Sequence, residues 1–109
     1  MATLVTFNAI IGDAFWKRFI FKESGVAKDI TNWKIKFILK ERAADLDANA
    51  LVTKEVTSHS DPTNGISYAE LISEAQSVEL SGAYYYKVSI DRGNGYVTIM
   101  YGLLTLNQA

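Results

Sequence analysis

The sequence predicts an all-β domain, built as a sandwich or a barrel, and three observations lead to this prediction. Two segments, Trp33–Lys40 and Tyr84–Asp91, alternate apolar and polar residues with a period of two, which is the pattern of a half-buried strand. Other segments rich in aromatic and β-branched residues are separated by turn signals at intervals of about 8–12 residues. The 109 residues, 49% of them hydrophobic, suffice for one self-sufficient core, so residues 1–109 are expected to form a single domain.

The first half of the chain contains three predicted strands. Leu4–Ile11 and Phe15–Lys22 are rich in aromatic and β-branched residues and are split by a turn at Gly12. A second turn is expected at Ser24-Gly25, before the strand Trp33–Lys40. In that strand one face is expected to be buried, and it consists of Trp33, Ile35, Phe37 and Leu39.

The middle of the chain contains two predicted strands around the strongest loop signal. Leu51–His59 ends at the loop Ser60–Gly65, which contains the only proline. Ile66–Ile72 follows, and we expect it to pair with the strand before the loop.

One segment allows a different interpretation. Ser67 and Glu70 have the spacing of a capping box, and the composition after them would support a helix as far as Leu80. We prefer a strand followed by a short helical turn around Ser73–Ser77.

The last two strands are expected to form a hairpin. The inward residues of the first are Tyr84, Tyr86, Val88 and Ile90. Asn94-Gly95 readily adopts the positive φ angles of a hairpin turn, and Tyr96–Leu106 returns as the partner strand. Val97, Ile99 and Tyr101 would share one face of it, and Gly102 would interrupt the alternation with a bulge.

Charge and composition exclude several classes of partner. The net charge of −1 favours no nucleic acid, and no apolar run approaches the length needed to cross a membrane. The absence of cysteine excludes disulfides and thiol chemistry. The start, Met1–Val5, lacks the features of a secretory signal, so synthesis in the cytoplasm is expected. Residues 1–54 nevertheless carry a charge of +3 and residues 55–109 a charge of −4.

The motifs that would carry chemistry are incomplete. Asp45–Asn49 has the alternating oxygens of a calcium loop, but Ala50 and Val56 replace the required Gly and Glu. His59, the only histidine, precedes a Pro-Asn-Gly loop and is interpreted as an exposed loop residue. Glu70 and Glu74 would share a helical face as two solvated carboxylates. We therefore expect no enzyme activity, and no catalytic, cofactor or metal site.

The thirteen aromatic residues are divided between core and surface. Alternation assigns Trp33, Phe37, Tyr84 and Tyr86 to the core, which leaves Trp16, Tyr85 and Tyr96 as candidate interface residues. Exposed rings of this kind can anchor a protein interface or stack on sugars. Ordinary cross-strand packing is the alternative.

Three stretches of the chain match motifs of one known family. The first comprises Gly12–Phe15, Ser24–Val26 and Asp29–Phe37; the second comprises Ser60–Pro62 and Gly65-Ile66; the third comprises Leu80–Val88, Gly95–Thr98 and Gly102–Leu106. Together they resemble the immunoglobulin-like domain of tail and baseplate proteins of tailed bacteriophages, as in the N-terminal region of baseplate upper proteins.

The resemblance implies an immunoglobulin-like antiparallel sandwich of about seven strands. In such sandwiches a Tyr at the start of a strand, here Tyr84 after Gly82, returns its hydroxyl to the backbone. Gly82 is therefore assigned to the structural core together with Tyr84. Tyr86 would take the core position that disulfide-linked relatives give to Cys, with Trp33 against it.

The function that follows from the resemblance is that of a non-enzymatic structural module. It would be made in the host cytoplasm, reside in the virion, and assemble with other phage structural proteins or with copies of itself. The opposed charges of the two halves suggest head-to-tail stacking of copies. A carbohydrate-binding module that uses the exposed rings is the alternative.

Overall fold

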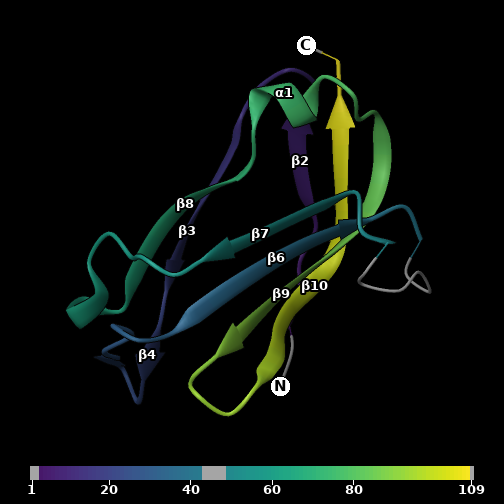
Figure 1. Cartoon of the computed structure of the whole chain (residues 1–109). Helices are drawn as coiled ribbons and strands as arrows, with labels where there is room; N and C mark the ends of the chain where they lie inside the picture. The colour runs from purple at the N-terminus through teal and green to yellow at the C-terminus, as the bar shows by residue number, and fades with distance from the viewer. Residues whose placement is uncertain (1–2, 43–48, 109) are drawn as a thin grey trace.

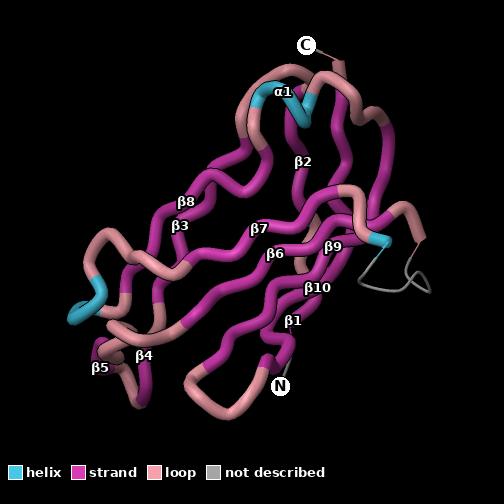
Figure 2. The backbone as a smooth tube through the Cα atoms, in the orientation of Figure 1, coloured by secondary structure: helices cyan, strands magenta, loops and turns pink. Residues whose placement is uncertain are grey.

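The computed structural model describes residues 3–42 and 49–108, and nearly all of its regular elements are strands (Figure 1, Figure 2). This confirms the predicted all-β class. In chain order the elements are β1 (Thr3–Leu4), β2 (Phe7–Ile10), β3 (Phe15–Ile20), β4 (Lys22–Glu23), β5 (Val26–Ala27), β6 (Lys34–Lys40), β7 (Val52–Val56), the 3₁₀ helix η2 (Pro62–Asn64), β8 (Ile66–Ile72), α1 (Glu74–Ser77), β9 (Gly82–Asp91) and β10 (Tyr96–Asn107).

The larger sheet has the strand order β1-β10-β9-β6-β7. β2 pairs with β10 further along the edge that β1 occupies, and both pairings are parallel, with Leu4 beside Tyr101 and Phe7 beside Leu104. The other neighbours in this sheet are antiparallel. The long strand β10, drawn in yellow, therefore carries the N-terminal strands on one edge and β9 on the other (Figure 1).

The smaller sheet consists of β3 and β8, which run antiparallel and apart from the other strands (Figure 2). Phe19 and Leu71 from this sheet pack into the same buried cluster as Phe37, Tyr86 and Leu104 from the larger sheet. The two sheets are therefore two layers that share one apolar core. The short hairpin β4–β5 stands outside both sheets.

The alternation predicted for β6 and β9 is confirmed on the core side. The inward residues of both strands are at most 2% exposed, namely Ile35, Phe37, Leu39, Tyr86, Val88 and Ile90. The opposite face of β6 is more covered than the pattern indicated, because Ile38 and Lys40 are also buried. β6 lies between β7 and β9, and flanking strands cover the methylene stem of a lysine as readily as an apolar side chain.

The hairpin of β9 and β10 is confirmed, but its bulge lies elsewhere than predicted. The register shifts at Ile99, because Thr98 faces Ser89 and Met100 faces Val88. One extra residue reverses the phase of alternation. Val97 and Tyr101 therefore lie on opposite faces of β10, and the prediction that they share one is wrong.

The turn of this hairpin also differs in detail from the prediction. Positive φ angles occur at Gly93 and Gly95 and not at Asn94. The Asp91 carboxylate accepts hydrogen bonds from the backbone N–H groups of both glycines, and these bonds hold the pKa of Asp91 below its usual range. The predicted turn at Ser24 and Gly25 is confirmed, with positive φ at both residues.

β8 is confirmed over the predicted residues, but its partner is β3 and not the preceding strand. The loop that contains η2 carries the chain from the larger sheet to the smaller one, which a local pattern does not reveal. The short helix α1 also agrees with the preferred interpretation. Its capping box uses Ser73 and Gln76, whereas Ser67 and Glu70 lie in the strand. Glu70 and Glu74 consequently share no helical face.

Candidate functional site

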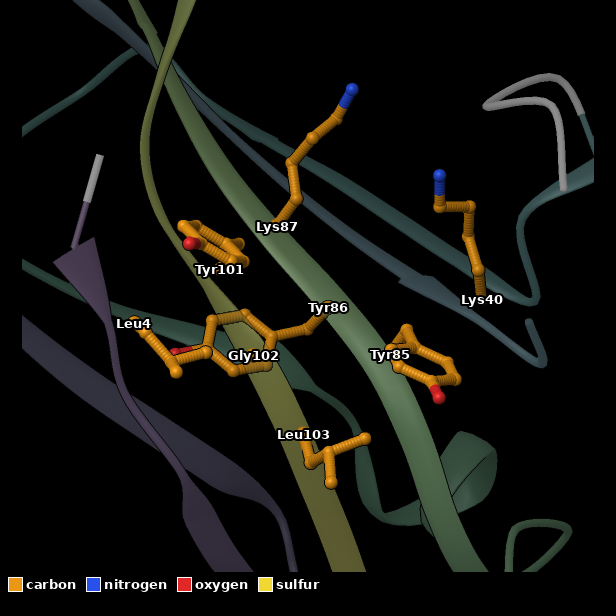
Figure 3. A pocket seen from close by; sticks show the side chains of 8 residues that line it. All are labelled: Leu4, Lys40, Tyr85, Tyr86, Lys87, Tyr101, Gly102 and Leu103. Atoms are coloured by element: carbon orange, nitrogen blue, oxygen red, sulfur yellow. The ribbon is translucent and has the colours of Figure 1, made fainter. Parts of the chain in front are cut away.

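A groove of about 330 Å³ lies on the outer face of the larger sheet, away from the core (Figure 3). We call it the outer groove. Its walls come from β1, β6, β9 and β10, and they consist of Leu4, Lys40, Tyr85, Tyr86, Lys87, Tyr101, Gly102 and Leu103.

Strand register brings most of these residues together in two rows across the sheet. Leu4 lies beside Tyr101, which faces Lys87. In the next row Leu103 faces Tyr85, which in turn faces Lys40. Neighbours opposite each other in a sheet have side chains on the same face, so each row presents apolar groups beside a lysine.

At Gly102, the backbone of Val5, which follows β1, lies very close to β10. A Cβ atom at this position would lie 2.1 Å from the Val5 carbonyl oxygen, so no larger residue fits without moving the backbone. The same oxygen accepts a hydrogen bond of 2.7 Å from the Tyr86 hydroxyl. A glycine is therefore required at position 102 because the Val5 backbone approaches β10 closely. This close approach, and not the predicted bulge, is the physical reason for the glycine.

The outer groove is apolar and accessible. Leu4 is 66% exposed, and Tyr85, Tyr101 and Leu103 are each 37–44% exposed. Contiguous exposed apolar side chains of this kind are uncommon on monomers and mark interaction sites. The lining groups offer apolar area, phenol hydroxyls and two ammonium groups, which are means of binding a partner.

The three candidate interface residues do not form one site. All three are exposed, but only Tyr85 lies in the outer groove. Trp16 lies on the smaller sheet and stacks on Tyr68 with ring centroids 5.1 Å apart.

The Tyr96 side chain contacts residues of β6 and β7, which are two and three strands away from β10 in the larger sheet. Its ring lies 4.2 Å from Nζ of Lys36, and its hydroxyl donates a 2.8 Å hydrogen bond to Glu55. Desolvation and this carboxylate raise the pKa of Tyr96 to about 12. The contacts of the Tyr96 ring are those of cross-strand packing, which is the alternative to a role as an interface residue.

Three of the predicted core residues pack as the alternation suggests. Phe37 and Tyr86 are buried and stack on each other with centroids 6.1 Å apart. The Tyr84 hydroxyl accepts a hydrogen bond from the Ser81 backbone N–H, so it does return to the backbone just upstream. Gly82 is exposed, so its assignment to the structural core is wrong; it begins β9 with the positive φ of 90° that favours glycine.

Trp33 does not pack against Tyr86, and that prediction is wrong. Its ring meets Phe21 edge-on at 5.3 Å and lies under the Arg92 guanidinium. The space beside Tyr86 is filled by Phe7 and Phe37. Trp33 precedes the first residue of β6, so it lies at the end of the sheet, whereas Tyr86 lies near the middle of β9.

His59 is not an exposed loop residue as predicted. It is half-buried, and both ring nitrogens have partners, the Ser67 hydroxyl at 2.9 Å and the Trp33 carbonyl at 2.8 Å. Because a carbonyl only accepts, Nε2 carries a proton toward Trp33, and Nδ1 can accept from Ser67. The ring therefore joins the start of β6 to β8.

Metal ligands are sparse in the described part of the chain. Within residues 3–42 and 49–108, no three or more His, Cys, Asp or Glu side chains gather where they could hold a metal ion. The calcium-like oxygens of Asp45 and Asp47 lie outside the described residues.

Comparison of the sequence with protein-family models and with curated proteins finds no match. Among the described residues no helix has the length and apolar character to cross a membrane. The interpretation of the outer groove therefore depends on its own residues.

Sequence reasoning missed most of the outer groove. The sequence pattern indicates only ordinary strand residues at Leu4, Tyr101 and Leu103, because their common face depends on the bulge at Ile99 and on parallel pairing with β1. One signal in the sequence does point to it. Tyr101-Gly102-Leu103 places a large apolar residue on each side of a glycine, so both of these side chains lie on the face opposite Leu104.

Proposed function

We propose that this chain is an immunoglobulin-like structural module that assembles with other proteins in the tail or baseplate of a bacteriophage. The observation that carries the assembly role is the outer groove, with its exposed Leu4, Tyr85, Tyr101 and Leu103. Tyrosine is among the residue types that contribute most to protein interfaces, and the two leucines add apolar contact area beside the two tyrosines.

Two structural features support the immunoglobulin-like part of the proposal. Two sheets with largely antiparallel pairing share one core, with β3 and β8 opposite the larger sheet. The hydrogen bond to the Tyr84 hydroxyl lies at the start of β9, where such sandwiches place their tyrosine corner. The bacteriophage context comes from the resemblance of Leu80–Val88 and the other matching stretches.

The chemistry of the groove supports one kind of partner. Lys40 and Lys87 line it beside the apolar groups. A partner segment with apolar side chains flanked by Asp or Glu would complement both features, since opposite charges across an interface favour the correct partner and orientation.

Co-expression with the products of neighbouring tail or baseplate genes tests the proposal. A tagged chain is purified together with each product, and Leu103→Asp is expected to reduce the retained partner at least about tenfold, because a buried charge opposes docking. Val26→Asp is the matched control, because Val26 is 68% exposed on the β4–β5 hairpin, outside the groove. Circular dichroism verifies that both variants fold.

Two results would overturn the proposal. Equal retention by Leu103→Asp and Val26→Asp would show that the groove is not the contact. Glycan-array binding that Trp16→Ala abolishes, without binding of any tail or baseplate product, would replace assembly with the carbohydrate-binding alternative.

A further inference from the structure

The smaller sheet has its own exposed face, which is independent of the outer groove. We call it the back face. It consists of the residues of β3 and β8 that alternate with the core residues, namely Trp16, Arg18, Ile20, Ile66, Tyr68 and Glu70. Trp16, Ile20 and Tyr68 are each about half exposed, at 48%, 53% and 54%.

The register of the two strands gives the centre of this face a particular symmetry. Trp16 faces Glu70 across the ladder, and Arg18 faces Tyr68 in the next row. The four side chains therefore occupy the corners of a rectangle. The two aromatic rings lie on one diagonal, where they stack, and the two opposite charges lie on the other.

The two charges have no partner within the part of the chain that the structure describes. Neither Arg18 nor Glu70 makes an ion pair or a side-chain hydrogen bond with residues 3–42 or 49–108. The face thus presents one cation, one carboxylate and an aromatic ridge, with no net charge among its six residues.

We infer that the back face binds the back face of a second copy of this chain. A two-fold axis that lies in the face along the Trp16–Tyr68 diagonal places each charged corner of one copy near the opposite charged corner of the other. Arg18 of one copy then meets Glu70 of its partner, and the converse pair forms as well. A face with one charge of each sign is complementary to itself under this symmetry, which is the requirement for an isologous dimer.

Other contacts between copies are less compatible with the charges. The edge strand β7 carries the exposed Lys54 on its core-facing side, opposite the buried Phe37. An inward-pointing lysine is a known means of preventing sheets from joining edge to edge.

The dimer is expected to be weak and sensitive to salt. The back face is formed by two strands of only six and seven residues. The surface that two such strands can bury is smaller than the area of a typical stable interface. Its ion pairs would be only partly buried, so added salt screens them. Self-association should appear as the concentration rises toward about 1 mM.

Sedimentation equilibrium over a concentration series tests the inference. The apparent mass of the wild-type chain is expected to rise from 12.1 kDa toward twice that value. Arg18→Glu and Glu70→Arg are each expected to lower the association constant at least about tenfold, because each brings like charges together. The double variant Arg18→Glu/Glu70→Arg is expected to restore association, since it exchanges the two charges.

Matched variants distinguish this inference from the proposed function. Lys22→Glu makes the same change of charge at an exposed position outside the back face and should associate as wild type does. Leu103→Asp in the outer groove should leave self-association unchanged. A wild-type chain that remains monomeric at 1 mM would overturn the inference, and so would a double variant that associates no better than the single variants.

Discussion

Tyr86 connects the N-terminal segment to the core through its aromatic ring and its hydroxyl group. Its ring packs between Phe7 and Phe37, and its hydroxyl donates to the carbonyl of Val5. Burial disfavours the charged phenolate and raises the pKa of Tyr86 to about 12, against about 10 for an exposed tyrosine. Because of Tyr86, the free energy of unfolding is expected to change with pH in the alkaline range.

The direction of this dependence follows from which state keeps the proton. Between about pH 10 and pH 12 the unfolded chain loses the Tyr86 proton while the folded chain retains it. The contribution of Tyr86 is therefore complete below pH 10 and is lost as pH rises toward 12. Tyr86→Phe is expected to be less stable at pH 7, because Val5 loses its donor, yet to lose stability less steeply above pH 10.

Urea unfolding at intervals from pH 7 to pH 12 measures this difference. Tyr101→Phe is the control, because Tyr101 is 44% exposed on the outer face, and it should follow the wild-type pH dependence. Parallel curves for Tyr86→Phe and the wild type above pH 10 would contradict the assignment.

At this scale the sequence predicts which residues face the core but not which atoms they bond. Alternation alone places Phe37 and Tyr86 inward, as found. The bonds of His59 to Ser67 and Trp33, and of Tyr86 to Val5, join segments far apart in the sequence. Local patterns contain no information about such contacts, so the sequence wrongly predicts an exposed His59.

Among the elements, the short helix α1 is attached to the rest of the fold mainly by one buried serine. Ser77 is fully buried, and its hydroxyl accepts from the Gly12 N–H at 2.9 Å and donates to the Ile10 carbonyl at 3.3 Å. Both partners lie where β2 turns into β3. Four helical residues are too few to be stable alone, so this attachment and the capping box of Ser73 and Gln76 hold the turn in place.

Removing the hydroxyl of Ser77 should therefore destabilise the whole domain. Ser77→Ala leaves the Gly12 N–H without its acceptor, whereas the Ile10 carbonyl loses one donor and keeps the Asp13 N–H at 3.1 Å. The expected cost is about 1–3 kcal/mol in the free energy of unfolding. Ser81→Ala is the control, because its side chain is exposed and only its backbone N–H is used. Chemical denaturation followed by tryptophan fluorescence measures both, and equal stabilities would contradict the role of Ser77.

The elements themselves were largely predictable, whereas their pairing was not. Period-two alternation predicts β6 and β9, and the preferred short helical turn after β8 agrees with α1. The sequence pattern assigns the capping box to Ser67 and Glu70, which lie in β8, and not to Ser73 and Gln76. The pairing of β8 with β3 and the bulge at Ile99 depend on which sheet each strand joins. Because the bulge decides which face Tyr101 takes, the outer groove could not be assembled from the sequence.

For the whole molecule, the two exposed surfaces lie on opposite sides of one core. The outer groove covers the larger sheet and the back face covers the smaller sheet, and the inward residues of both sheets form a single cluster. A partner in the groove would not obstruct a second copy at the back face. The two proposals are therefore compatible in one assembly, in which each copy binds one partner and one other copy.

The same arrangement predicts a gradient of stability across the molecule. β9 lies between β6 and β10 and is buried over most of its length, so its amides from Tyr86 to Ile90 should exchange with solvent most slowly. The hairpin β4–β5 is exposed and belongs to neither large sheet, and Val26 there should exchange at least about a hundredfold faster.

The N-terminal strand β1 is the informative case, because its two exposed residues form one wall of the outer groove. The Val5 N–H, bonded to the Tyr101 carbonyl at 2.9 Å, should exchange faster than the amides of β9 in the isolated chain. A partner that covers Leu4 should slow that exchange and leave Val26 unchanged. Hydrogen exchange followed by NMR, with and without the partner found by co-expression, measures both amides. Equal slowing at Val26 and Val5 would indicate general stabilisation and contradict contact at the groove.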